Sequence, residues 1–181
     1  MTGKRSTVPA ALCVAALGAL TGCTVPVAGV AGIAVSEDGR PLGVMLVCHH
    51  RIDGATLHDA DDGDDGDDGD EREDPPDLGR WSRGKAATGF TLWSLESGGR
   101  GWSTEVPASV PFSPRRTYRL YGWTRDNSWS ASAVSFTGAQ FAALEPGQVR
   151  YYKGEGMPGS DRDGYATVPF ATFRASACTG V

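Results

Sequence analysis

The densest group of side chains that could bind an ion is a run of carboxylates in the first half of the chain. Three Asp-Asp-Gly triplets follow one another from Asp61 to Gly69. A structured calcium loop of the form Asp-x-Asp-x-Asp-Gly needs carboxylates at alternate positions, and the triplet period puts glycine where the second ligand belongs. We therefore expect no structured calcium site. Weak, non-stoichiometric cation binding is the alternative, through Asp61, Asp62, Asp64, Asp65, Asp67 and Asp68.

The same stretch forms an acidic insert. The segment 59–77 holds 12 of the chain's 22 acidic residues and a single arginine, although the whole chain has a net charge of only −5. Dense like charges repel and offer little apolar surface to bury, so we expect a long disordered loop. Outside the insert basic residues outnumber acidic ones. That excess is small and scattered, so it does not indicate a nucleic-acid partner.

The histidines and serines form no recognisable catalytic motif. His49 and His50 are adjacent, so on a strand their side chains would point to opposite faces, and His58 stands alone. No His-Glu-x-x-His zinc motif and no Gly-x-Ser-x-Gly nucleophile motif are present. We expect strand-end histidines, no bound metal and no cofactor. A hydrolase site assembled from distant residues such as His49, His58 and the scattered aspartates and serines is the alternative.

The first 23 residues have the pattern of an export signal. Lys4 and Arg5 precede an apolar run over 8–20, which is too short to span a bilayer and is typical of a signal peptide. The run ends in Leu20-Thr21-Gly22-Cys23, which resembles the lipobox of bacterial lipoprotein precursors. This resemblance implies cleavage before Cys23, with residues 1–22 as signal peptide, and acylation of the Cys23 thiol. Lipid on Cys23 would then hold the chain to the extracytoplasmic face of the cell membrane.

The lipobox resemblance also bears on the remaining cysteines. Cys13 would leave with the signal and Cys23 would be acylated, so Cys48 and Cys178 would remain as a pair in an oxidising compartment. We predict a Cys48–Cys178 disulfide. Two buried free thiols are the alternative.

The segments that must position these residues have the sequence pattern of short strands. Apolar runs over 29–35, 42–49, 54–58, 90–95, 118–124, 129–136, 148–152 and 166–177 alternate with turn residues, and 140–144 could form one helical turn. After a tether over 23–28, we expect one all-β domain over 29–181, a single antiparallel β-sandwich that carries the acidic insert. The segment from Gly32 to Val47, with Asp38-Gly39 between two apolar runs, resembles the opening of transthyretin-like and carboxypeptidase-regulatory sandwich domains.

Aromatic side chains supply the candidate binding surface. Five tryptophans in so small a domain must fill much of the core, yet the alternation around Tyr121 and Trp123 requires some to face outward. Tyr121, Trp123 and Trp129 are the candidates for contact with an envelope glycan or a partner protein. The favoured hypothesis is a non-catalytic binding or structural lipoprotein of the cell envelope, with the envelope hydrolase as the alternative.

Overall fold

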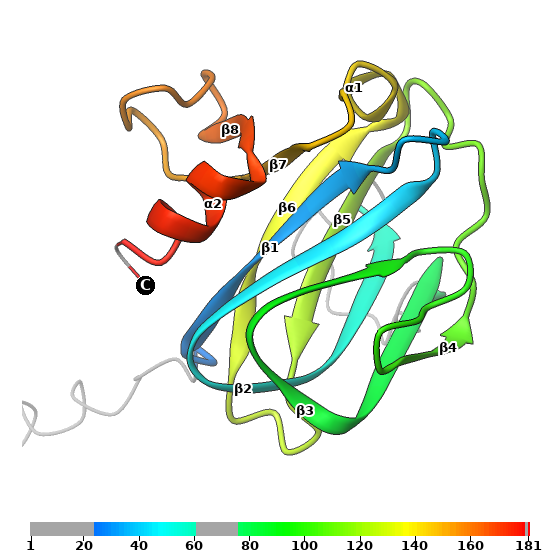
Figure 1. The fold of residues 1–181 in the computed structure, drawn as a ribbon, viewed down its shortest axis with the longest axis vertical. Coiled ribbons are helices and arrows are strands. Elements are labelled where there is room, and N and C mark those ends of the chain that lie inside the picture. Colours follow the sequence, from blue (N-terminus) through cyan, green and yellow to red (C-terminus); the bar gives the residue numbers. More distant parts are fainter. Residues whose placement is uncertain (1–23, 61–75, 180) are drawn as a thin grey trace, which may run out of the picture.

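The computed structural model describes residues 24–60, 76–179 and 181, and in this part the regular structure is mostly β-strand (Figure 1). The strands are β1 (Val27–Val35), β2 (Pro41–Asp59), β3 (Gly79–Ser94), β4 (Trp102–Val106), β5 (Thr117–Trp123), β6 (Ser130–Thr137), β7 (Gln148–Tyr152) and β8 (Tyr165–Pro169). Two short helices, α1 (Gly138–Ala142) and α2 (Phe170–Ser176), complete the fold. None of the helices in these residues is long and apolar enough to cross a bilayer. The all-β prediction is confirmed.

The strands form one sheet in the order β4-β3-β2-β5-β6-β1-β7-β8, and a further pairing of β1 with β2 closes part of it into a small barrel. The sheet is mixed, because β1 runs parallel to β6 while its pairings with β2 and β7 are antiparallel. The expectation of purely antiparallel pairing is therefore wrong. The short apolar run of β1 is buried along almost its whole length, as expected for a strand between two neighbours inside a barrel wall. The sandwich class stays a prediction.

The barrel closes because β2 is long and bent. Its first half pairs with β1 and its second half pairs with β5, while β3 follows β2 along both halves. The register shifts between Val47 and Ile52, and within this stretch His50 has a φ of 53°. Such irregularities bend a strand and increase its twist. The sequence-based expectation of two separate strands at 42–49 and 54–58 therefore corresponds to one strand with a bend between them.

Three of the five tryptophans lie in the core inside the barrel. Trp81, Trp93 and Trp102 are all but fully buried, and the rings of Trp93 and Trp102 stack with centroids 4.1 Å apart. A second core lies between the first part of the barrel wall, β7, β8 and α2, where Tyr151 and Phe173 meet edge to face. Most tryptophans serve packing, in agreement with the expectation from their number.

The C-terminal part departs from the prediction. The segment 166–177 was expected to be a strand, but only its beginning belongs to β8 and the rest is α2. The helix turns the apolar side chain of Phe173 into the second core, where it is completely buried. The helical turn expected at 140–144 is present as α1, which begins with a capping box between Thr137 and Gln140.

The ends of the acidic insert are ordered parts of the fold. Asp59 is the last residue of β2, is buried and forms an ion pair with Arg116. At the other end, Asp77 accepts a hydrogen bond from Arg80 at the start of β3. The candidate cation ligands Asp61, Asp62, Asp64, Asp65, Asp67 and Asp68, like Cys23, lie outside the described residues.

A disulfide joins Cys48 and Cys178, whose Cα atoms are 5.6 Å apart. The predicted pairing is therefore present. It ties the segment after α2 to the bend of β2 and so fastens the C-terminal layer to the barrel.

Replacing both Cys48 and Cys178 by serine should lower the free energy of unfolding by about 4–5 kcal/mol, because the disulfide closes a loop with a sequence separation of 130 residues. Urea titration followed by tryptophan fluorescence measures this loss. The single variant Cys48→Ser serves as control and should lose about as much as the double variant. A loss below about 1 kcal/mol would show that the bridge does not constrain the unfolded chain.

Candidate functional site

The structure brings Tyr121 and Trp123 of β5 into one open groove of about 480 Å³. Both side chains are half-buried, as the alternation of β5 predicts. Strands β3 and β4 and the loop after β5 supply the remaining lining residues, Arg80, Ser82, Glu105, Thr124, Arg125 and Asn127. Two of the three aromatic candidates therefore share a site rich in hydrogen-bonding groups.

Trp123 is held in place from several sides. Its cross-strand partner is Gly54, and a Cβ at Gly54 would lie only 2.2 Å from the Trp123 ring, so the indole lies close against the glycine backbone. Its Nε1 donates a hydrogen bond of 2.9 Å to Thr56 Oγ1. The guanidinium of Arg80 lies over the ring, 4.8 Å from its centroid. This contact is a cation–π interaction.

Arg80 is itself fixed by two carboxylates. It forms ion pairs with Asp77 at 2.9 Å and with Glu105 at 3.1 Å. The hydrogen bond to Asp77, followed by the charges of Asp77 and Glu105, raises the pKa of Arg80 despite partial burial. A ligand ring that stacked on Trp123 would therefore compete with a well-held guanidinium. The groove is better suited to hydrogen bonding than to stacking.

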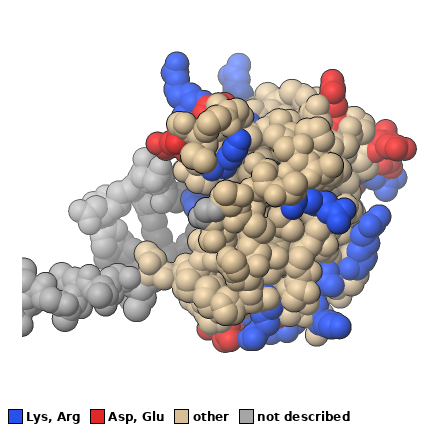
Figure 2. Space-filling model, turned by 60° about the vertical axis from the view of Figure 1, so that its left-hand side comes forward, with Lys and Arg blue, Asp and Glu red and all other residues tan. Residues whose placement is uncertain are grey.

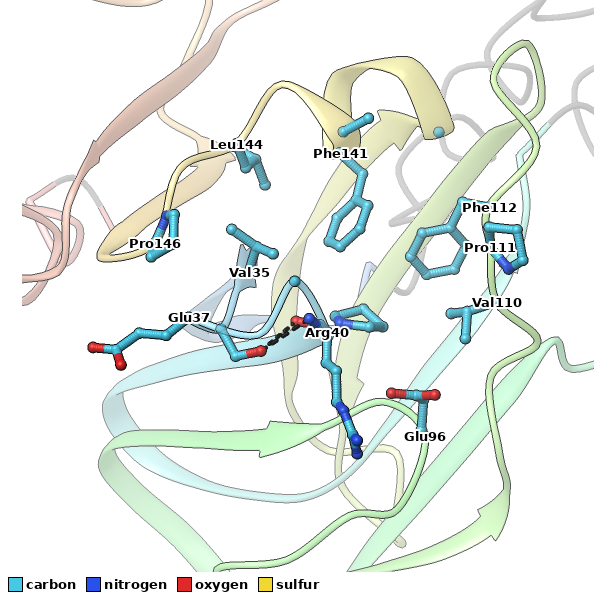
Figure 3. A pocket seen from close by; sticks show the side chains of 15 residues that line it. Val35, Glu37, Arg40, Glu96, Val110, Pro111, Phe112, Phe141, Leu144 and Pro146 are labelled. Atoms are coloured by element: carbon cyan, nitrogen blue, oxygen red, sulfur yellow. Dashed lines mark hydrogen bonds between the residues drawn. The ribbon is translucent and has the colours of Figure 1, made fainter.

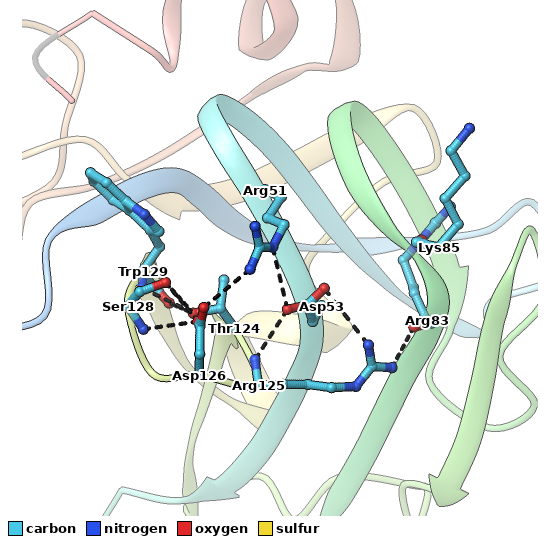
Figure 4. Close-up of polar contacts among 9 residues, drawn as sticks. All are labelled: Arg51, Asp53, Arg83, Lys85, Thr124, Arg125, Asp126, Ser128 and Trp129. Carbon is cyan, nitrogen blue, oxygen red and sulfur yellow. Dashed lines mark hydrogen bonds and ion pairs between the residues drawn. The ribbon is translucent and has the colours of Figure 1, made fainter.

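Trp129 lies outside this groove. Trp129 ends the loop between β5 and β6 (Figure 4). Its indole stacks on the ring of His50, with centroids 3.7 Å apart. In that loop Asp126 accepts a 2.6 Å hydrogen bond from Ser128, which together with bonds from Thr124 and the Ser128 backbone lowers the pKa of Asp126 to about 2. The expectation that Trp129 forms one surface with Tyr121 and Trp123 is not met, because Trp129 does not line their groove.

Figure 4 also shows a polar cluster at the bend of β2. The carboxylate of Asp53 is almost fully buried and faces the guanidinium groups of Arg51 and Arg125, at 3.8 and 3.9 Å. It also accepts a hydrogen bond from the backbone N–H of Arg125. A buried carboxylate needs such partners, so this cluster fixes the loop after β5 against the bend.

In the described part of the chain, His49 and His58 lie in separate places. His58 lines a shallow pocket with Tyr121, Ser130 and Ser132, and no carboxylate lines that pocket. Burial, followed by the charge of Arg119, lowers the pKa of His58 and favours its neutral form. His49 lies elsewhere, at the C-terminal residue Val181. In the part of the chain that the structure describes, no three His, Cys, Asp or Glu side chains are arranged to hold a metal ion.

A larger groove of about 650 Å³ lies at the far end of β1, and the sequence analysis missed it (Figure 3). It is formed by the β1–β2 turn, the segment before β5 and α1. Its walls are mostly apolar, from Val35, Val110, Pro111, Phe112, Phe141, Leu144 and Pro146. These residues come from three distant parts of the chain, so no local motif signals the groove.

A partly buried carboxylate, that of Glu96, lies at this apolar groove. Glu96 is among its lining residues, and in the described part of the chain the buried Oε2 atom of Glu96 has no hydrogen-bond partner. Glu37 and Arg40 lie at the other side of the groove, and Arg40 is paired with Asp38 at 2.9 Å. An unpaired buried acceptor carries a cost of about 1–3 kcal/mol, which a ligand donor could relieve.

Comparison of the chain with protein-family models, with curated proteins and with solved structures finds no match.

Gly54→Ala should destabilise the protein by about 1–3 kcal/mol and change the near-ultraviolet circular dichroism, because the new methyl group collides with the Trp123 ring. Gly84→Ala is the matched control, since Gly84 of β3 has open space around the position of a Cβ. The control should stay within about 0.5 kcal/mol of the parent protein. Equal effects of the two substitutions would contradict the close contact between Trp123 and Gly54.

Proposed function

We propose that this chain is a lipoprotein of the bacterial cell envelope, anchored through acylated Cys23, and that its barrel is a non-catalytic binding module. The proposal for the anchor is supported by the lipobox, Leu20-Thr21-Gly22-Cys23, and by the apolar run before it. The proposal for binding is supported above all by the apolar groove that contains the Glu96 carboxylate.

The groove suits a segment of a partner protein in which an apolar side chain stands beside a lysine or arginine. Large apolar pockets with a few polar groups are the usual form of binding sites, and Val110, 38% exposed, offers surface for such a contact. The charged groups at the groove favour a cation, because Glu37 and Glu96 line it and the lining Arg40 is already paired with Asp38 outside it. An ammonium or guanidinium group would also satisfy the unpaired oxygen of Glu96.

The proposed anchor and the groove lie at opposite ends of β1. Cys23 precedes the start of β1 at Val27, whereas Val35 at its end lines the groove. Nine residues of strand span roughly 26 Å. A module tethered at one end would thus offer its groove to partners at a distance from the lipid.

A glycan ligand in the Tyr121–Trp123 groove is the second candidate. The observation in its favour is the combination of two half-buried aromatic rings with Ser82, Asn127 and Arg125 in one groove. The Arg80 guanidinium over Trp123 makes this candidate weaker, because sugar rings are recognised largely by stacking on free aromatic faces.

The mature protein should carry a diacylglycerol group on Cys23, and Cys23→Ala should abolish it. Mass spectrometry of protein extracted from membranes, together with incorporation of labelled palmitate, measures the modification. Cys13→Ala is the control, since Cys13 would be removed with the signal peptide, and it should leave the label unchanged. An unmodified Cys23, or a leader still attached, would refute the proposed anchor.

Hexylammonium should bind in the groove at millimolar concentration, and hexanoate, which has a similar chain and the opposite charge, should bind much more weakly. The measurement is amide chemical-shift change at Val35, Phe141 and Leu144. Glu96→Gln should weaken hexylammonium binding about tenfold, in keeping with a hydrogen bond to a charged group.

Glu37→Gln is the control for this experiment, because Glu37 is exposed at the edge of the groove. It should weaken binding by less than about threefold, as expected of a solvent-screened charge. Equal affinity for the two probes, or an effect of Glu96→Gln no larger than that of Glu37→Gln, would contradict a cation-selective groove.

A further inference from the structure

Three of the five large hydrophobic side chains exposed in the described part of the chain lie together, beside the start of β1. Val27, Tyr152 and Met157 have exposed fractions of 41%, 38% and 45%. All three line one hollow of about 460 Å³, together with residues of β1, β6 and the segment after α2. Scattered exposed apolar residues are ordinary, but a contiguous group marks a contact surface.

This side of the molecule carries few charges. Figure 2 shows the side with α2 turned forward, and a broad area free of charged side chains lies there beside the point at which the described chain begins. Among the side chains that line the hollow, Lys153 is the charged one. We call Val27, Tyr152, Lys153 and Met157 the anchor-side face.

The local fold presents Met157 outward. Met157 lies in the loop between β7 and β8, where Gly154, Gly156 and Gly159 have φ values of 114°, 68° and 80°. Such backbone conformations favour glycine. The Met157 backbone accepts a hydrogen bond from Ser160 Oγ, which holds the turn at this residue. This turn therefore holds the apolar side chain of Met157 in an exposed position.

The length of the tether determines what can cover this face. Cys23 precedes Val27 by four residues, so the Cα atom of an acylated Cys23 would lie within about 14 Å of the Val27 Cα atom. Residues this close to the anchor are held at the level of the lipid headgroups. Apolar and aromatic side chains next to a lysine are the composition that suits such an interface.

We propose that the anchor-side face rests on the surface of an anionic phospholipid bilayer, with Val27, Tyr152 and Met157 in the headgroup region and Lys153 beside an anionic headgroup. This inference rests on the proposed lipid anchor at Cys23. It adds a defined orientation of the barrel, in which the groove with Glu96 points away from the bilayer.

The test uses the acylated full-length product with Met157→Cys labelled by a fluorescent bimane. Cys48 and Cys178 form a disulfide and Cys23 would carry lipid, so the new thiol is the one that reacts. The protein is reconstituted in phosphatidylcholine–phosphatidylglycerol vesicles that contain phosphatidylcholine spin-labelled near the headgroup. The lipid spin label should quench position 157 at least threefold more than the matched control Val106→Cys, an exposed site on β4 at the other end of the sheet.

A second variant tests the face itself. Tyr152→Glu, combined with the label at 157, should reduce this quenching at least twofold, because a carboxylate is repelled by the anionic surface. Equal quenching at positions 157 and 106, or no effect of Tyr152→Glu, overturns the assignment. The mass of the same preparation separates the two proposals. If the quenching results are negative and Cys23 is acylated, only the proposed orientation of the barrel is refuted. If Cys23 is unmodified, the proposed lipid anchor is refuted as well.

Discussion

The bend in β2 is the constraint on which the rest of the structure depends. One continuous strand pairs with β1 before the bend and with β5 after it, and β1 in turn reaches β6, so the wall closes on itself. Without the register shift between Val47 and Ile52, the second half of β2 would continue past β1 and the core would stay open on one side. The buried Asp53 and the disulfide at Cys48 both lie at this bend, so the same short segment also fixes the loop after β5 and the C-terminal layer.

Local patterns predicted the parts of the fold that depend on local chemistry. Alternation identified the outward side chains of Tyr121 and Trp123, and the Thr137–Gln140 capping box lies beside the helical turn that was expected. The pairing of Cys48 with Cys178 was expected because the lipobox resemblance accounts for the other two cysteines, Cys13 and Cys23. By contrast, α2 was taken for a strand, because Phe170–Ser176 spans only two turns and its burial depends on a pocket that other strands create. The parallel pairing of β1 with β6 has no local signal either, since it joins segments about a hundred residues apart.

The candidate sites also show that local sequence patterns do not predict contacts between distant segments. Tyr121, Trp123 and Trp129 were the aromatic candidates for a binding surface. In the structure Tyr121 and Trp123 line the same groove, whereas Trp129 stacks on His50. The groove with Glu96 could not be found from sequence, because its walls converge only when the β1–β2 turn, the segment before β5 and α1 have folded together. What distinguishes Glu96 from the other glutamates in the described part of the chain is an oxygen buried without a donor, which is a property of the folded chain and not of the residue type.

In the export route proposed above, the position of the disulfide also bears on how the precursor would cross the membrane. Thiols stay reduced in the bacterial cytoplasm, so a precursor there would lack the covalent link between the bend of β2 and the segment after α2. The C-terminal layer would then be held to the barrel only by non-covalent contacts, among them the β1–β7 pairing and the packing around Phe173. A precursor in that state is easier to keep loosely folded for threading through a translocon, and oxidation on the far side would lock the finished form and oppose its return.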